Sequence, residues 1–140
     1  MSNLVKTFLM KLDRIQPSQL YISREKLNQV LKGLANPRSL SIKPIPLATL
    51  GNEVIFLDGH TRALAVFLRG ASDITVCWED EEIDWEMYKI CVEWCKEEGI
   101  RSIADLERRI VSQEDYETLW IQRCRSLEQE LDKKRGKKIA

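Results

Sequence analysis

The residues best suited to chemistry form one short run, Asp58-Gly59-His60-Thr61-Arg62. It holds a titratable carboxylate, the only histidine of the chain, and an arginine that can donate paired hydrogen bonds to phosphate or carboxylate. Gly59 lets a ligand approach the backbone closely because it has no side chain. These residue types predict an anion site, with Asp58 and His60 as the candidate groups for proton transfer.

The surrounding sequence predicts that this run is a strand-to-helix corner. The apolar residues Val54 to Leu57 indicate a buried strand, and Thr61 to Leu68 indicate a short helix that is apolar on most sides. Such a corner presents unpaired backbone N–H groups and the positive end of the helix dipole to a ligand. The residues expected to bind phosphate are Gly59, His60, Thr61 and Arg62. The alternative is structural, because Asp, His or Thr before a helix also serves as a cap.

Length and composition limit the class of protein. With 140 residues, zero formal net charge and 44% hydrophobic residues, the chain predicts one compact unit with a real core. A neutral balance disfavours a strongly basic DNA-binding surface but leaves room for a local patch. Four cysteines without secretory features predict reduced thiols.

The N-terminal stretch Leu4 to Leu12 is too short, and too often interrupted by lysine, for a signal or membrane segment. We therefore expect a cytoplasmic protein with no membrane partner. The spacing of the apolar residues in this stretch predicts a short amphipathic helix.

The first half of the chain predicts a small sheet with helices. The elements expected besides the corner are an extended piece (15–22), a helix (24–32, ended by Gly33), a polar loop (36–44), two strands (45–50 and 53–57) and a last strand (74–78). The two strands in the middle are expected to form a hairpin around Gly51-Asn52.

Beyond Trp78 the pattern becomes helical. An acidic connector (79–84) leads into a helix (85–98), and the pairs Ser102 with Asp105 and Ser112 with Asp115 resemble capping boxes that open a short and a long helix. The long helix carries a stripe expected to be buried, formed by Tyr116, Trp120, Cys124, Leu127 and Leu131.

The order of elements from Leu12 to Trp78 resembles the ParB/sulfiredoxin-like domain, and the sharpest match is the run Val54 to Ala65. The resemblance implies an α/β fold with a small mixed sheet and helices. It divides the chain into a ParB/sulfiredoxin-like domain with an N-terminal helix (1–78) and a C-terminal helical extension packed on it (79–140).

The branches of this family differ at the corner. Sulfiredoxins carry a catalytic cysteine where this chain has His60, so a sulfinic-acid reductase is disfavoured. ParB proteins hold nucleotide phosphates at this corner, and the chain keeps their glycine, last arginine and alanine at Gly59, Arg62 and Ala65. The nearest corner is that of the free-serine kinases, which Asp58, Gly59, His60 and Arg62 match and from which Thr61 departs.

One position weakens the kinase interpretation. In the free-serine kinase branch a catalytic glutamate follows the proline of the first extended segment by two residues, and the corresponding residue here is Gln19. An amide cannot take a proton from a hydroxyl as a carboxylate does, so Glu25 or Asp58 would have to substitute. Gln19 and Glu25 are therefore accessory candidates.

The sequence thus predicts a protein that binds a nucleotide or another phosphorylated small molecule at Asp58 to Arg62. Phosphotransfer with ATP or ADP and magnesium, held by Asp58, would be its enzymatic form. The alternative is a non-catalytic regulator of ParB-like fold that associates with DNA or with another protein. The neutral net charge weakens its DNA form.

Two other groups of residues have types and spacings that could suit a metal site or a base-stacking site. Cys91 and Cys95 lie one helical turn apart, but without a Cys-x-x-Cys pair they are expected to be buried thiols and no metal site is predicted. Trp85, Trp94 and Trp120 could stack on bases, yet core packing is the expectation because their helices are broadly apolar.

Overall fold

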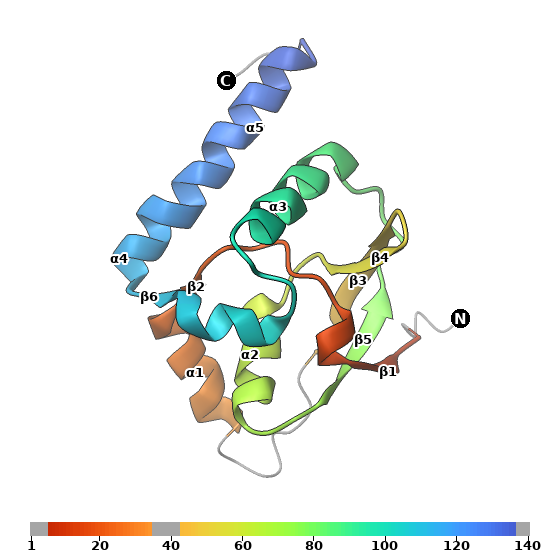
Figure 1. Ribbon diagram of the computed structural model, residues 1–140, viewed down its shortest axis with the longest axis vertical. Helices are drawn as coiled ribbons and strands as arrows, with labels where there is room; N and C mark the ends of the chain where they lie inside the picture. The colour runs from red at the N-terminus through yellow and green to blue at the C-terminus, as the bar shows by residue number, and fades with distance from the viewer. Residues whose placement is uncertain (1–5, 35–42, 137–140) are drawn as a thin grey trace, which may run out of the picture.

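The computed structural model describes residues 6–34 and 43–136, and Figure 1 shows a curled sheet with helices around it and a long C-terminal helix. The sheet is mixed. Its strands, in spatial order, are β1 (Phe8–Lys11), β5 (Asp73–Trp78), β3 (Ile45–Leu50) and β4 (Glu53–Phe56). The α/β class with a C-terminal helical extension is therefore confirmed.

The register of the sheet places two rows of side chains on the same face. β1 and β4 run antiparallel to their neighbours, whereas β3 and β5 are parallel. One row is Phe8, Val76 and Ile45, and the next row is Trp78, Leu47 and Phe56. Four of these six side chains, those of Val76, Ile45, Leu47 and Phe56, are fully buried. Side chains alternate between the faces of a strand, so the two rows form part of one packed surface.

The extended segment after β1 closes the sheet beside β4. The N–H of Gln16 donates to the Val54 carbonyl at 2.9 Å, and the N–H of Phe56 donates to the Gln16 carbonyl at 3.0 Å. A short second sheet pairs β2 (Ile22–Ser23) with β6 (Ile110–Val111) in parallel. Both contacts join residues far apart in the sequence.

The helices follow the predicted pattern closely. The α-helices are α1 (Arg24–Leu34), α2 (His60–Leu68), α3 (Trp85–Glu97), α4 (Gln113–Tyr116) and α5 (Gln122–Lys134). The 3-10 segments among the described residues are η1 (Leu12–Arg14) and η3 (Ile103–Arg109). A π-helical segment, η4 (Glu117–Ile121), joins α4 to α5, so the chain is helical from 113 to 134.

Local signals set the starts of the second-half helices. The side chain of Asp84 accepts a hydrogen bond from the Met87 N–H and caps α3. The capping box of Ser102 and Asp105 is confirmed, since both of its hydrogen bonds are present. The Ser112 hydroxyl accepts the Asp115 N–H at 3.1 Å, which gives one half of the second box.

The predicted N-terminal helix is wrong where the structure describes it, because Phe8–Lys11 is a strand paired with β5. Phe8 and Met10 are half-buried while Leu9 and Lys11 are exposed, which is the alternation of a strand. The sequence cannot show this partner, since β5 lies more than sixty residues further along. Residues 1–5 and the predicted loop from 36 to 42 lie outside the described residues.

A smaller correction concerns the end of α1. Gly33 does not end α1, which continues to Leu34, because a glycine inside a helix costs only about 1 kcal/mol.

All four cysteines are free thiols. Burial raises the pKa of Cys91 and of Cys95 to about 12. Within residues 6–34 and 43–136, no helix is long and apolar enough to cross a membrane.

The long C-terminal helix presents its predicted stripe to the rest of the protein. Tyr116, Trp120, Leu127 and Leu131 are buried, and Cys124 is half-buried. Trp120 meets Trp94 of α3 edge-on with ring centroids 6.3 Å apart. Trp94 and Trp120 therefore pack in the interior, as expected, whereas Trp85 is 46% exposed.

Candidate functional site

The corner is a turn at the end of β4 that opens α2. Gly59 is the N-cap of α2 with a φ of +78°, and no side chain caps the helix. The first N–H bonded within the helix is that of Ala63, which donates to the Gly59 carbonyl at 2.9 Å. The first turn of α2 contains the N–H groups of His60, Thr61 and Arg62. Such N–H groups have no hydrogen-bond acceptor within the helix itself. The predicted strand, glycine turn and helix are confirmed.

Close packing makes Gly59 necessary at this position. A Cβ added here would lie 2.6 Å from Ile45 Cδ1 and 2.9 Å from Arg62 Nη2, both too close for a real contact. The positive φ is also a conformation that glycine adopts without strain. The corner thus rests directly on Ile45 of the sheet, and the Arg62 guanidinium folds back over it.

Arg62 is half-exposed and held by one hydrogen bond. Its Nη1 donates to the Lys43 carbonyl at 3.0 Å, just before β3. Among the described residues no ion pair joins Arg62 to a carboxylate. Its positive charge therefore lies at the start of α2 without a neutralising partner there, which favours an anion in the same place.

His60 is buried and uncharged. Its Nε2 accepts a hydrogen bond from the Ser18 N–H at 3.0 Å, and its ring packs on Phe56 with centroids 5.2 Å apart. Burial lowers the pKa of His60 to about 4, and the nearby charge of Asp58 opposes this shift only in part. With Nε2 acting as an acceptor, the proton of the neutral ring must lie on Nδ1, so His60 is a donor through Nδ1.

Ser18 ties the first extended segment to the corner, and sequence reasoning missed it. Besides its N–H bond to His60, its hydroxyl donates to the Phe56 carbonyl at 2.7 Å. Ser18 is 5% exposed. A serine after a proline carries no local signal of such a role, because its partners lie about forty residues away.

Asp58 is exposed, and its charge acts on two tyrosines of the helical extension. The Tyr88 hydroxyl on α3 donates to the carbonyl of Leu57 at 3.1 Å, directly before Asp58. Burial raises the pKa of Tyr88, and the Asp58 charge raises it further. For Tyr116 burial is again the main cause, with a smaller contribution from Asp58. Sequence reasoning placed Tyr116 in the core stripe and gave Tyr88 no role.

The accessory candidates differ in their placement. The Gln19 amide Nε2 donates to the Tyr21 carbonyl at 2.8 Å and to the Tyr116 hydroxyl at 3.3 Å, so it lies between the first segment and the extension. Glu25 is exposed in the first turn of α1. No hydrogen bond or ion pair within the described ranges joins Glu25 to the corner, and its role stays a prediction.

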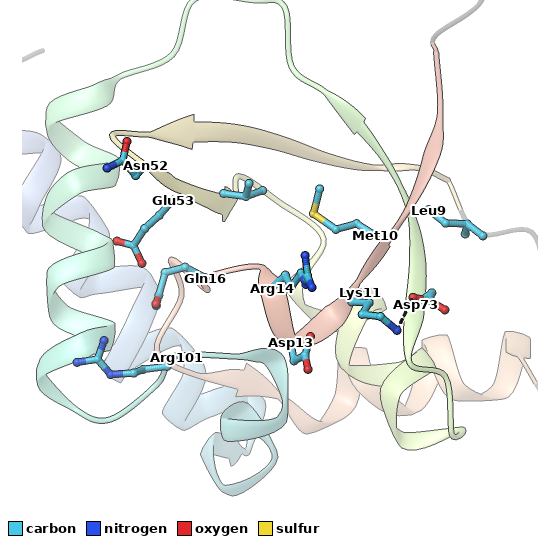
Figure 2. A pocket seen from close by; sticks show the side chains of 11 residues that line it. Leu9, Met10, Lys11, Asp13, Arg14, Gln16, Asn52, Glu53, Asp73 and Arg101 are labelled. Carbon is cyan, nitrogen blue, oxygen red and sulfur yellow. Dashed lines mark ion pairs between the residues drawn. The ribbon is translucent and has the colours of Figure 1, made fainter.

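A separate cleft of about 720 Å³ lies at the opposite end of β4. Figure 2 shows its walls, which come from β1 and η1, from the hairpin residues Asn52 and Glu53, and from Arg101. Lys11 and Asp73 form an ion pair across one side at 4.0 Å. None of the corner residues lines this cleft. In the described part of the chain, no group of three or more His, Cys, Asp or Glu could hold a metal ion.

The comparisons with known proteins give likeness of fold alone. No family model and no curated protein matches the sequence. Among solved structures, protein Atu1540 from Agrobacterium tumefaciens is 13% identical, with a TM-score of 0.47 over 69% of this chain and 50% of that one. A conserved hypothetical protein from Pyrococcus furiosus is 22% identical, with a TM-score of 0.49 over 54% of this chain and 33% of that one.

A free serine kinase in complex with AMP is 20% identical, again with a TM-score of 0.49, over 54% of this chain and 32% of that one. A variant of the kinase in complex with ADP matches equally well. The chain spans half or less of the length of these proteins. At this level of similarity the neighbours do not bear on what the chain binds.

Proposed function

We propose that the chain binds a nucleotide or another phosphorylated small molecule at the corner from Asp58 to Arg62. The observation that carries the proposal is the start of α2, where no side chain caps the helix and the Arg62 guanidinium folds over the same turn. The unpaired N–H groups, the positive end of the helix dipole and the guanidinium cation then lie together at the start of α2. An anion of phosphate size satisfies all three.

Each residue of the corner would make a different interaction with the bound phosphate. The N–H groups of His60 and Thr61 would donate to phosphate oxygens, as at other helix N-termini, and Arg62 would neutralise the charge. His60 is fixed by the Ser18 N–H and stays neutral, so it would contribute its Nδ1 proton as a donor. In this proposal His60 would act as a positioning and donor group.

The enzymatic form of the proposal would be phosphotransfer with ATP or ADP. Asp58 is the exposed carboxylate of the corner, and Mg²⁺ commonly takes one or two carboxylates together with phosphate oxygens. In this form Asp58 would hold the magnesium ion of the nucleotide or accept a proton.

Gln19 favours binding without turnover. Both hydrogen bonds of its Nε2 are to groups of the protein, the Tyr21 carbonyl and the Tyr116 hydroxyl. A neutral amide held in this way cannot remove a proton from a substrate hydroxyl. We therefore propose a binding protein in the first place, and an enzyme only if Asp58 serves as the base.

The proposal is tested by calorimetric titration of AMP, ADP and ATP, each with and without magnesium, into wild type and Arg62→Ala. A hydrogen bond to a charged group contributes about 1.5–3 kcal/mol, so Arg62→Ala should weaken binding by about 10- to 150-fold. Thermal unfolding in the same ligands gives an independent readout, because a ligand of the folded state raises Tm.

Arg69→Ala is the matched control. Arg69 lies at the other end of α2 and, like Arg62, donates one hydrogen bond to a backbone carbonyl, here that of Leu31 at 3.2 Å. Its loss should leave nucleotide affinity unchanged. The proposal fails if no phosphorylated ligand binds at millimolar concentration, or if Arg69→Ala weakens binding as much as Arg62→Ala does.

A further inference from the structure

Trp78 is an exposed aromatic residue in the same row of the sheet as Leu47 and Phe56. It ends β5 and is 48% exposed, although tryptophan is usually well buried. One side of it is supported by Phe8 of β1, with ring centroids 5.5 Å apart and planes tilted by 41°. Phe8 therefore limits how the indole can turn and leaves much of the ring open to solvent.

The register of the sheet fixes where Trp78 lies relative to the corner. Trp78 is the neighbour of Leu47, and Leu47 is the neighbour of Phe56, so two strand spacings, about 10 Å, separate Trp78 from Phe56. All three side chains point to one face because residues paired in register share a face. The His60 ring packs on Phe56 on this face.

The glycine turn packs on the neighbouring row of the same sheet face. Ile45 contacts the position of a Gly59 Cβ, and Ile45 is the register neighbour of Val76, two residues before Trp78 on the same face. The Arg62 guanidinium covers this turn. Trp78 and the residues on which the corner packs therefore belong to neighbouring rows of one sheet face, a separation on the order of the length of a nucleotide.

We infer that Trp78 stacks on the aromatic base of a nucleotide whose phosphate binds at the corner, which makes Trp78 a specificity-determining residue. This inference rests on the proposed function and narrows it to nucleoside phosphates. A phosphorylated sugar or amino acid offers no aromatic ring and gains nothing from the indole. Base-to-aromatic stacking tolerates every base, so Trp78 selects for a ring without choosing among bases.

Trp85 supplies a matched control for this residue. It is 46% exposed, nearly the same as Trp78, and it is the first residue of α3, outside the sheet. Replacing either tryptophan by leucine removes one half-exposed indole. Only the loss of Trp78 should affect a base bound beside the corner.

The experiment compares AMP with ribose 5-phosphate by calorimetric titration into wild type, Trp78→Leu, Trp78→Tyr and Trp85→Leu. Wild type should bind AMP about tenfold more tightly than ribose 5-phosphate, since stacking on one base accounts for a difference of that order. Trp78→Leu should abolish the difference without changing the affinity for ribose 5-phosphate. Trp78→Tyr should keep part of it, and Trp85→Leu all of it.

The outcomes separate this inference from the proposed function. If ribose 5-phosphate binds and depends on Arg62, but the advantage of AMP is absent or survives Trp78→Leu, the stacking inference is overturned and the phosphate corner stands. If neither ligand binds, the stacking inference is overturned, and the titrations of ADP and ATP decide whether the proposed function also fails. Circular dichroism of each variant checks that it is folded, and Trp78→Tyr repeats the test with a smaller change of shape.

Discussion

Replacing Gly59 by alanine tests the packing that builds the corner. The change adds one methyl group where the backbone has a φ of +78° and where Ile45 Cδ1 lies 2.6 Å from the added atom. Ile45 is fully buried in the core, so its side chain has little room to move. The Arg62 Nη2, 2.9 Å away, is the end of a flexible side chain and can withdraw.

The expected cost has two parts. A non-glycine residue in the left-handed region costs about 1–2 kcal/mol. Pushing a methyl group into a packed contact costs about 1–3 kcal/mol more. The backbone cost and the packing cost together amount to about 2–5 kcal/mol. Domains of this kind are stable by about 5–15 kcal/mol, so the variant should lose a large share of its free energy of unfolding.

The difference between Gly59→Ala and a control variant, Gly51→Ala, isolates the packing contribution. Gly51 has a φ of +63° in the β3–β4 hairpin, and an added Cβ would meet nothing within 4 Å. It should therefore lose only the backbone contribution. Urea unfolding followed by tryptophan fluorescence gives both values. A difference below about 0.5 kcal/mol between the two variants would refute the close-packing argument, since it would mean that Ile45 relaxes freely.

Three further predictions concern groups that the corner buries or that lie far from it. The folded-state pKa of His60 is below its unfolded value, so the unfolded chain binds more protons between pH 6.5 and 4. The free energy of unfolding should therefore fall by about 2 kcal/mol as the pH drops from 7 to 5. The variant His60→Asn should not show this pH dependence. Ser18→Ala leaves the buried Phe56 carbonyl without its 2.7 Å donor and should cost about 1–3 kcal/mol in urea unfolding. Cys91 and Cys95, with pKa values raised to about 12, should react with a thiol reagent at pH 8 only when the protein unfolds.

The corner could be predicted from the sequence because each of its parts is local. An apolar run, a glycine and a short apolar helix determine a strand, a turn and a helix within fifteen residues, and β4, Gly59 and α2 are found where the pattern indicated. The hairpin around Gly51-Asn52 was predictable for the same reason. Turn chemistry and helix starts depend on neighbours in the chain, which a sequence displays directly.

Interactions across long sequence separations could not be predicted. The residues before Leu12 carry apolar positions that suit a helix, yet pairing with β5 makes Phe8–Lys11 a strand. Gln19 was recognised by its position after Pro17, but its hydrogen bond to the Tyr116 hydroxyl crosses ninety-seven residues. In the same way, nothing near Tyr88 indicates that its hydroxyl holds the carbonyl of Leu57.

These long-range contacts tie the helical extension to the corner. The Gln16 amide donates to the Ile100 carbonyl at 2.9 Å, and Arg109 donates to the Leu20 carbonyl at 3.0 Å. The parallel β2–β6 pair adds a third connection to the segment that contains Ser18 and Gln19. Ser18 in turn fixes His60.

These contacts argue against a binding function that is confined to residues 1–78. Removing the extension would take the buried residues Ile100, Ile103 and Leu106 out of the shared core, and it would free the segment that orients His60. It would also take away Tyr88, the donor to Leu57. The boundary between residues 78 and 79 stays a prediction about folding units, but a binding site at the corner has to be a property of both halves, since groups from both hold its backbone in place.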